Sequence, residues 1–127
     1  MANDLRGETE IKLGERALKA RVNWNAIREF ETASGVRWNA LVFRLRANDI
    51  GYIEIAHLVY ACCRAGDKAF KDDFDSFADQ IVAEGFSVAQ ALALELTALG
   101  SVPRKAAESL KEADGSDKKP DPSTGTS

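Results

Sequence analysis

The sequence predicts an α+β fold that is mostly α, with an N-terminal two-stranded antiparallel hairpin packed on a compact bundle of about five helices. Three observations support this prediction. Apolar residues lie two apart up to Val22, which is the period of a half-buried strand. From Ile27 they lie three to four apart, which is the period of an amphipathic helix. Glycines then interrupt the helical part and divide it into short segments.

The register of the hairpin follows from its turn. Gly14 followed by Glu15 suits a two-residue type II′ turn, in which the first central residue has a positive φ. The resulting pairs are Ile11–Leu18 and Thr9–Ala20 on an apolar face, and Glu10–Lys19 and Glu8–Arg21 on an ionic face. Because an isolated two-stranded hairpin is marginally stable in water, the apolar face must pack on the helices.

Five helical segments are expected after the hairpin. Asn23 caps the first, and Ser87 with Gln90 forms a capping box at the start of the fifth. The third, "YIEIAHLVYACCRAG", is apolar on nearly all sides, which predicts the central buried helix. The expected helix ends are Gly35, Gly66 and, for the fifth helix, Gly100 followed by Pro103. The inward-facing residues expected in the other four are Ile27 and Phe30; Trp38, Leu41, Val42 and Leu45; Phe74, Phe77, Ala78, Ile81 and Val82; and Val88, Leu92, Leu96 and Leu99.

These segments define one domain over residues 7–112, preceded by a flexible leader at 1–6. A weaker helical stretch is expected at 103–112. The remaining segment, 113–127, has no large apolar side chain and is predicted to be a disordered tail, because it has nothing to bury against its ordering entropy.

Composition narrows the class of protein. The net charge is −3, with a balance of +2 in residues 1–66 and −5 in residues 67–127, which is too mild a polarity to favour a nucleic-acid partner. No apolar run approaches the roughly 18 residues of a membrane span, so no membrane partner is expected. Cys62 and Cys63 are adjacent and make no disulfide framework, which indicates reduced core thiols in a cytoplasmic protein.

No residue pattern predicts catalysis, a metal or a cofactor. His57 is the single histidine, so a pair of Glu-x-x-His metal motifs is excluded, and it is interpreted as a surface histidine beside Glu54. The two cysteines lack the spacing and the further ligands of a zinc site. The aspartates at 72, 73, 75 and 79 lie on a helix-period segment without the glycine and glutamate of a calcium loop, and they are expected to face solvent. We therefore expect a protein that is not an enzyme.

Two apolar residues fall away from their helices' inward stripes. Phe43 lies opposite the stripe of the second helix, and Leu94 raises the same question in the fifth. Each is either a second packing contact or an exposed anchor for a partner. Arg44 and Arg46 flank the stripe of the second helix and, with Phe43 and Leu94, form the candidate partner-binding set. The same arginines leave open a small DNA-binding or regulatory protein.

The order of these parts resembles a known family. A charged leader and a hairpin followed by "NAIREFETASG" resemble the opening of small phage tail proteins, and are similar to the tail assembly chaperone family that includes a protein of bacterial gene transfer agents. "LVFRLRANDIGYIEIAHLVYACCRAG" is similar to that family in the order and spacing of helix, loop and apolar helix. The resemblance covers about residues 7–100. The Gly-Glu turn and the two tryptophans, Trp24 and Trp38, depart from the family pattern.

The resemblance implies a function without catalytic residues. A member of this family keeps the long tape-measure protein in solution during tail assembly, helps recruit tail tube subunits and then leaves. The implied partners are therefore the tape-measure protein and the tail tube protein, in the cytoplasm of a bacterial host. Self-association, a longer frameshifted form and a place in the finished tail as a minor structural component stay open at this stage.

Overall fold

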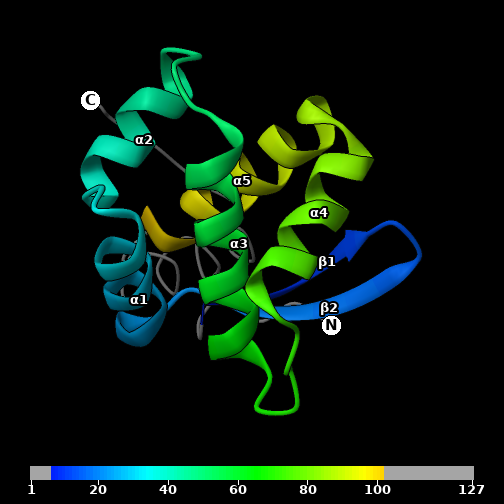
Figure 1. The fold of residues 1–127 in the computed structure, drawn as a ribbon. Coiled ribbons are helices and arrows are strands. Elements are labelled where there is room, and N and C mark those ends of the chain that lie inside the picture. The colour runs from blue at the N-terminus through cyan, green and yellow to red at the C-terminus, as the bar shows by residue number, and fades with distance from the viewer. Residues whose placement is uncertain (1–6, 102–127) are drawn as a thin grey trace, which may run out of the picture.

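A computed structural model describes residues 7–101 of the chain. It contains an antiparallel hairpin followed by five helices, which confirms the predicted mostly-α α+β class (Figure 1). The elements are, in order, β1 (Glu8–Leu13), β2 (Arg16–Arg21), α1 (Trp24–Ser34), α2 (Trp38–Arg46), α3 (Tyr52–Gly66), α4 (Phe74–Glu84) and α5 (Phe86–Ser101). The expected leader at 1–6, the helical stretch at 103–112 and the tail at 113–127 lie outside the described residues.

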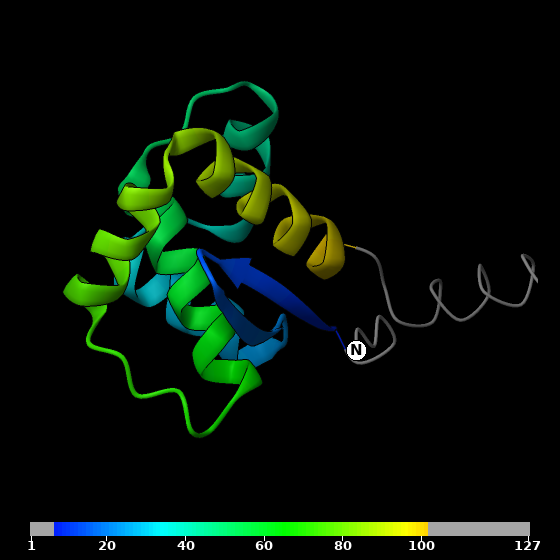
Figure 2. The ribbon, with the colours of Figure 1, turned by 90° about the vertical axis from the view of Figure 1, so that its right-hand side faces the viewer.

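The hairpin has the predicted register, with Ile11 opposite Leu18 and Glu8 opposite Arg21. Gly14 has a φ of 64°, as the first central residue of a type II′ turn requires. Ile11 is buried in the core, so the alternation in the sequence correctly assigned the apolar face. Figure 2 shows α5 running beside the hairpin, and Thr9 Oγ1 donates a 3.2 Å hydrogen bond to Glu95 Oε2.

Helix α3 is the centre of the molecule, as its composition predicted. It packs against α1, β2, α4 and α5. Its fully buried residues include Leu58 and both thiols, Cys62 and Cys63, which are free as expected. The exception is Ile53 in its first turn, whose side chain is 71% exposed. The interior of the domain is therefore built around one helix with apolar neighbours on nearly every side.

Hydrogen bonds at helix ends fix the start of α1 and the corner between α1 and α2. The Asn23 side-chain oxygen accepts from the Ala26 N–H at 2.9 Å, which confirms the predicted cap. Gly35 ends α1 in the left-handed conformation, with a φ of 74°. The Trp38 N–H, at the start of α2, donates to Glu31 Oε2 at 2.9 Å. The two helices are thus joined through a short loop and a carboxylate from the first.

Two glycines have roles that the sequence reading did not assign. Gly66 is the last residue of α3, but a Cβ there would lie 2.6 Å from the backbone oxygen of Lys19. Gly100 lies inside α5, which is described through it to Ser101, and Pro103 lies outside the described residues. A Cβ at Gly100 would lie 2.4 Å from the Val22 side chain. Both positions lack a side chain so that a helix can approach the hairpin region closely.

The start of the fifth helix also differs from the prediction. Helix α5 begins at Phe86, one residue after Gly85, so Ser87 lies inside the first turn and does not form the expected capping box. Gln90 instead donates from its side-chain amide to Asn48 Oδ1 at 2.6 Å. Gly85 has a φ of 97°, which lets the chain reverse between α4 and α5 without a loop.

Two inward predictions are wrong. Val82 of α4 is 50% exposed and Val88 of α5 is 38% exposed. In α4 the fully buried side chains are Phe77 and Ile81, so the buried stripe is narrower than the apolar stripe of the sequence. The buried face of α5 is centred on its small residues and two leucines: Ala89, Leu92, Ala93, Leu96 and Thr97.

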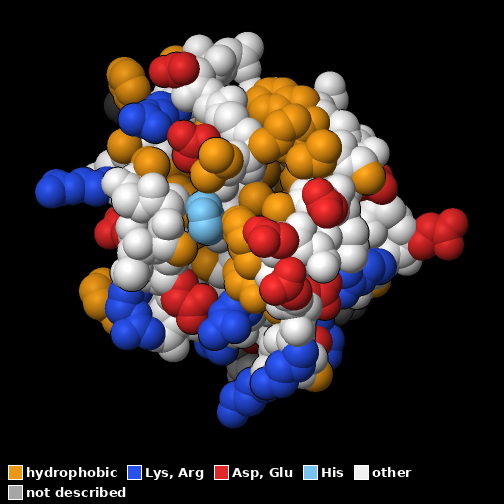
Figure 3. All heavy atoms as spheres, viewed as in Figure 1, with side chains coloured by type: hydrophobic (Ala, Val, Ile, Leu, Met, Phe, Trp, Pro, Cys, Tyr) orange, Lys and Arg blue, Asp and Glu red, His pale blue; other side chains and the backbone are white. Residues whose placement is uncertain are grey.

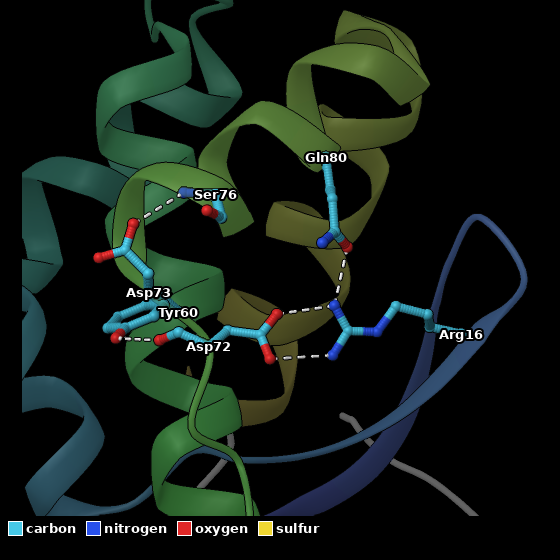
Figure 4. A network of polar contacts seen from close by, with 6 residues as sticks. All are labelled: Arg16, Tyr60, Asp72, Asp73, Ser76 and Gln80. Atoms are coloured by element: carbon cyan, nitrogen blue, oxygen red, sulfur yellow. Dashed lines mark hydrogen bonds and ion pairs between the residues drawn. The ribbon is translucent and has the colours of Figure 1, made fainter.

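A polar network holds the hairpin to the loop before α4 (Figure 4). Arg16 Nη1 donates to Asp72 Oδ2 at 2.7 Å and to Gln80 Oε1 at 2.8 Å. The Tyr60 hydroxyl donates to the Asp72 backbone oxygen at 2.7 Å. The hydrogen bond from Arg16 lowers the pKa of the Asp72 carboxyl. Asp72 was expected to face solvent with the other aspartates, so its placement against the hairpin corrects that expectation.

Within residues 7–101, no single helix is long and apolar enough to cross a membrane. Helices α4 and α5 together meet the length and composition of a span, but they bend by 113° where they join.

Candidate protein-binding surface

The structure places both predicted apolar anchors on the surface. Phe43 is 76% exposed in the middle of α2, and Leu94 is 46% exposed in the middle of α5. Neither side chain packs into the core. The sequence left open a second packing contact or an exposed anchor for a partner, and the isolated chain shows no such packing contact. An exposed aromatic side chain on a well-packed helix is held ready for a partner at little cost in backbone entropy.

The four predicted residues do not form one site. Leu94 and Arg46 line a small groove of about 160 Å³ between α2 and α5. Phe43 is not among the residues that line it. Arg44 is turned toward α3, where its Nη1 lies 3.4 Å from Glu54 Oε2. The structure therefore brings Leu94 and Arg46 together and leaves Phe43 and Arg44 outside their groove.

The Arg44–Glu54 pair has a structural explanation. Glu54 Oε1 also accepts from the Gly51 N–H at 3.1 Å at the start of α3. Its two oxygens thus join the end of α2 to the start of α3 across the loop. Arg44 is half-buried in this arrangement and offers little free charge to a nucleic-acid backbone.

Other large apolar side chains are exposed that the sequence reading did not identify as anchors. Trp24 is 74% exposed, Ile53 71% and Phe86 38%. Trp24 follows the Asn23 cap directly, so it lies in the first turn of α1. The exposure of these side chains, and of Val82 and Val88, was not predicted from the sequence. The apolar pattern of a helix does not show which edge of its apolar face packs against a neighbouring element.

A hollow with a volume of about 540 Å³ lies between α1, α3 and the start of α4. His57 is at its edge, stacked on Phe74 with ring centroids 4.4 Å apart. Burial lowers the pKa of His57, while the nearby Glu54 carboxylate opposes that shift. Arg64 and Glu29 also line the hollow and pair with each other at 3.1 Å. Arg28 lines the hollow too, and it donates a hydrogen bond to the Asn25 side chain at 3.1 Å.

The two thiols of α3 are not activated. Burial raises the pKa of the Cys63 thiol to about 12 and raises that of Cys62 further. A thiol in this state is protonated at neutral pH and is a poor nucleophile and a poor metal ligand. Within residues 7–101, no group of three His, Cys, Asp or Glu side chains is placed to hold a metal ion.

Comparison with known proteins found no match to any family model, curated protein or solved structure.

Proposed function

We propose that the protein is a tail assembly chaperone of a phage or gene transfer agent. In this role it binds the tape-measure protein in the bacterial cytoplasm and helps recruit tail tube subunits. The observation that carries the proposal is the 76% exposure of Phe43 on a helix whose opposite face is buried. The order of elements, a hairpin followed by five helices, agrees with the order on which the family resemblance rests.

Exposed apolar side chains are what a holding function requires. A chaperone for a long, aggregation-prone helical chain must offer apolar contacts and stay soluble by itself, which charged neighbours achieve. Phe43 is followed by Arg44 and Arg46 on the same helix, and Arg46 is exposed. A single aromatic anchor at the centre of an interface can contribute more than about 2 kcal/mol to binding.

The test is co-expression with the tape-measure protein that the proposal expects to be encoded beside this gene, with the soluble fraction of that protein as the readout. We expect the wild-type chain to raise the soluble fraction and Phe43→Asp to abolish the effect. The matched control is Asn39→Asp, which introduces the same charge at another exposed position of α2 and should leave the rescue intact.

The melting temperature of Phe43→Asp distinguishes an anchor from a core residue. Because the Phe43 side chain is mostly exposed, the variant should melt within a few degrees of the wild type. Unfolding of the variant would contradict the anchor assignment. A wild-type chain that gives no rescue, but shifts a DNA probe with a steep salt dependence, would replace the proposal with the DNA-binding alternative. The presence of this protein in purified tail particles would instead identify it as a minor structural component of the tail.

A further inference from the structure

A second apolar surface, separate from Phe43, lies over α3, α4 and the corner between α4 and α5. We call it the α3–α4 strip and define it by Ile53, Val82 and Phe86. Phe86 is held by an edge-on contact with Tyr52, with ring centroids 5.2 Å apart. Figure 3 shows hydrophobic side chains gathered at the corner where α4 turns into α5, with further ones between α3 and α4.

The strip follows the contact between two helices. Helices α3 and α4 run antiparallel (Figure 1), and the stacked rings of His57 and Phe74 join them partway along α3. Ile53 lies one turn before His57, and Val82 lies two turns after Phe74, so both extend from the stack in the same direction. Two antiparallel helices present a shallow groove along their contact, which is the kind of surface that accepts the apolar face of a third helix.

The charged side chains that flank the strip on α4 are acidic. Asp75, Asp79 and Val82 fall on one stripe of α4 at spacings of four and three residues, and all three are exposed. Neither aspartate takes part in an ion pair among residues 7–101. Figure 3 shows acidic side chains along this edge of the hydrophobic strip. A partner placed on Val82 would therefore meet unpaired negative charge on one flank.

We propose that the α3–α4 strip binds an amphipathic helix of another protein, whose apolar face covers Ile53, Val82 and Phe86 and whose lysines or arginines face Asp75 and Asp79. The proposal rests on the proposed function in that a helical partner is expected, and it adds the surface and the charge of that partner. A second copy of this chain is disfavoured, because a two-fold contact centred on Val82 brings Asp75 and Asp79 of both copies together.

The test uses the full chain and two synthetic peptides as long as α3. One peptide has leucine on one face and lysine on the other, and the second has glutamate in place of lysine. At low salt we expect the lysine peptide to bind at least about tenfold more tightly, as measured by fluorescence anisotropy. The difference should shrink as salt is added. Equal binding of the two peptides, or binding of neither, would overturn the proposal.

Variants locate the binding surface. Reversing both charges, Asp75→Lys with Asp79→Lys, should switch the preference to the glutamate peptide. Val82→Ser should weaken binding of the lysine peptide by about fivefold or more, because it removes apolar contact from the strip. The matched control is Val88→Ser, which changes a valine of similar exposure on the opposite side of α5 from Phe86. An equal loss in both valine variants would place the peptide elsewhere.

The outcomes separate this inference from the proposed function. The peptide assay contains no tape-measure protein, so a chain that selects the lysine peptide but gives no rescue supports the strip and contradicts the chaperone role. A chain that rescues the tape-measure protein but binds the two peptides equally, or binds neither, contradicts the strip alone. If light scattering shows a dimer that Val82→Ser dissociates, the occupant is a second copy and the proposal is wrong.

Discussion

Gly66 is the position where a single methyl group should damage the fold most clearly. A Cβ added there would lie 2.6 Å from the Lys19 backbone oxygen and 2.8 Å from the Cα and carbonyl carbon of Ala20. All three neighbours are backbone atoms of β2, so none can rotate away. Gly66→Ala therefore requires the end of α3 to move away from the hairpin.

The cost can be bounded from general magnitudes. Overpacking a well-packed contact costs about 1–3 kcal/mol and occasionally more. Replacing glycine by alanine in a helix gains at most about 1 kcal/mol, and less in the last turn. The net loss of unfolding free energy should be roughly 0.5–2.5 kcal/mol, which corresponds to a fall in melting temperature of about 3–15 °C for a domain of this size.

The assay is thermal unfolding followed by circular dichroism, with Gly51→Ala as the control. Gly51 precedes α3 with a φ of −118°, and a Cβ there meets only the end of the Glu54 side chain, at 3.3 Å. The control should lose less than about 1 kcal/mol. If Gly66→Ala melts at or above the wild-type temperature, α3 does not approach β2 as closely as these distances require.

The remaining predictions concern α3 and the polar network. Leu58→Ala should lower the unfolding free energy by about 2–5 kcal/mol in urea titration, because Leu58 is fully buried. His57→Ala should cost only about 0.5–1.5 kcal/mol, because it removes a half-buried ring from its stack on Phe74; equal damage in both variants would mean that α3 is wrongly oriented. Arg16 lowers the pKa of Asp72, so the pair stabilises the fold above the unfolded-state pKa of an aspartate and this stabilisation is lost as pH falls through the folded-state pKa. Asp72→Asn should therefore cost about 1 kcal/mol or less at pH 7, since both side chains are partly exposed. The difference from wild type should disappear in the acid range, and a difference that persists there would assign the effect to lost packing.

The fold was predictable because its signals are local. The change of period near Val22, the Asn23 cap and the glycine in the hairpin turn each act within a few residues, and each has the expected conformation. The continuous apolar sequence of α3 requires neighbours on nearly all sides, which allows little choice except the centre of the molecule. These features depend on the chain's own periodicity and need no knowledge of distant contacts.

The candidate surface was less predictable from the sequence. It depends on which edge of each helix's apolar face packs against another element. Val82 belongs to the same apolar stripe as Ile81, yet only Ile81 is buried, since α4 meets its neighbours along a narrow line. Arg44 looked like a free cation in the sequence, but it pairs with Glu54 across a loop. Gly66 looked like a helix stop, although its role depends on a strand far earlier in the chain.

The two exposed surfaces differ in a way that bears on the proposed function. Phe43 shares α2 with the exposed Arg46, whereas Val82 shares α4 with Asp75 and Asp79. Partners of opposite charge are therefore favoured at the two surfaces, and one partner helix does not satisfy both. A protein that holds one chain and recruits another needs two surfaces of this kind. Phe43→Asp and Val82→Ser should then impair different steps of assembly, because each removes the apolar contact of one surface and leaves the other unchanged.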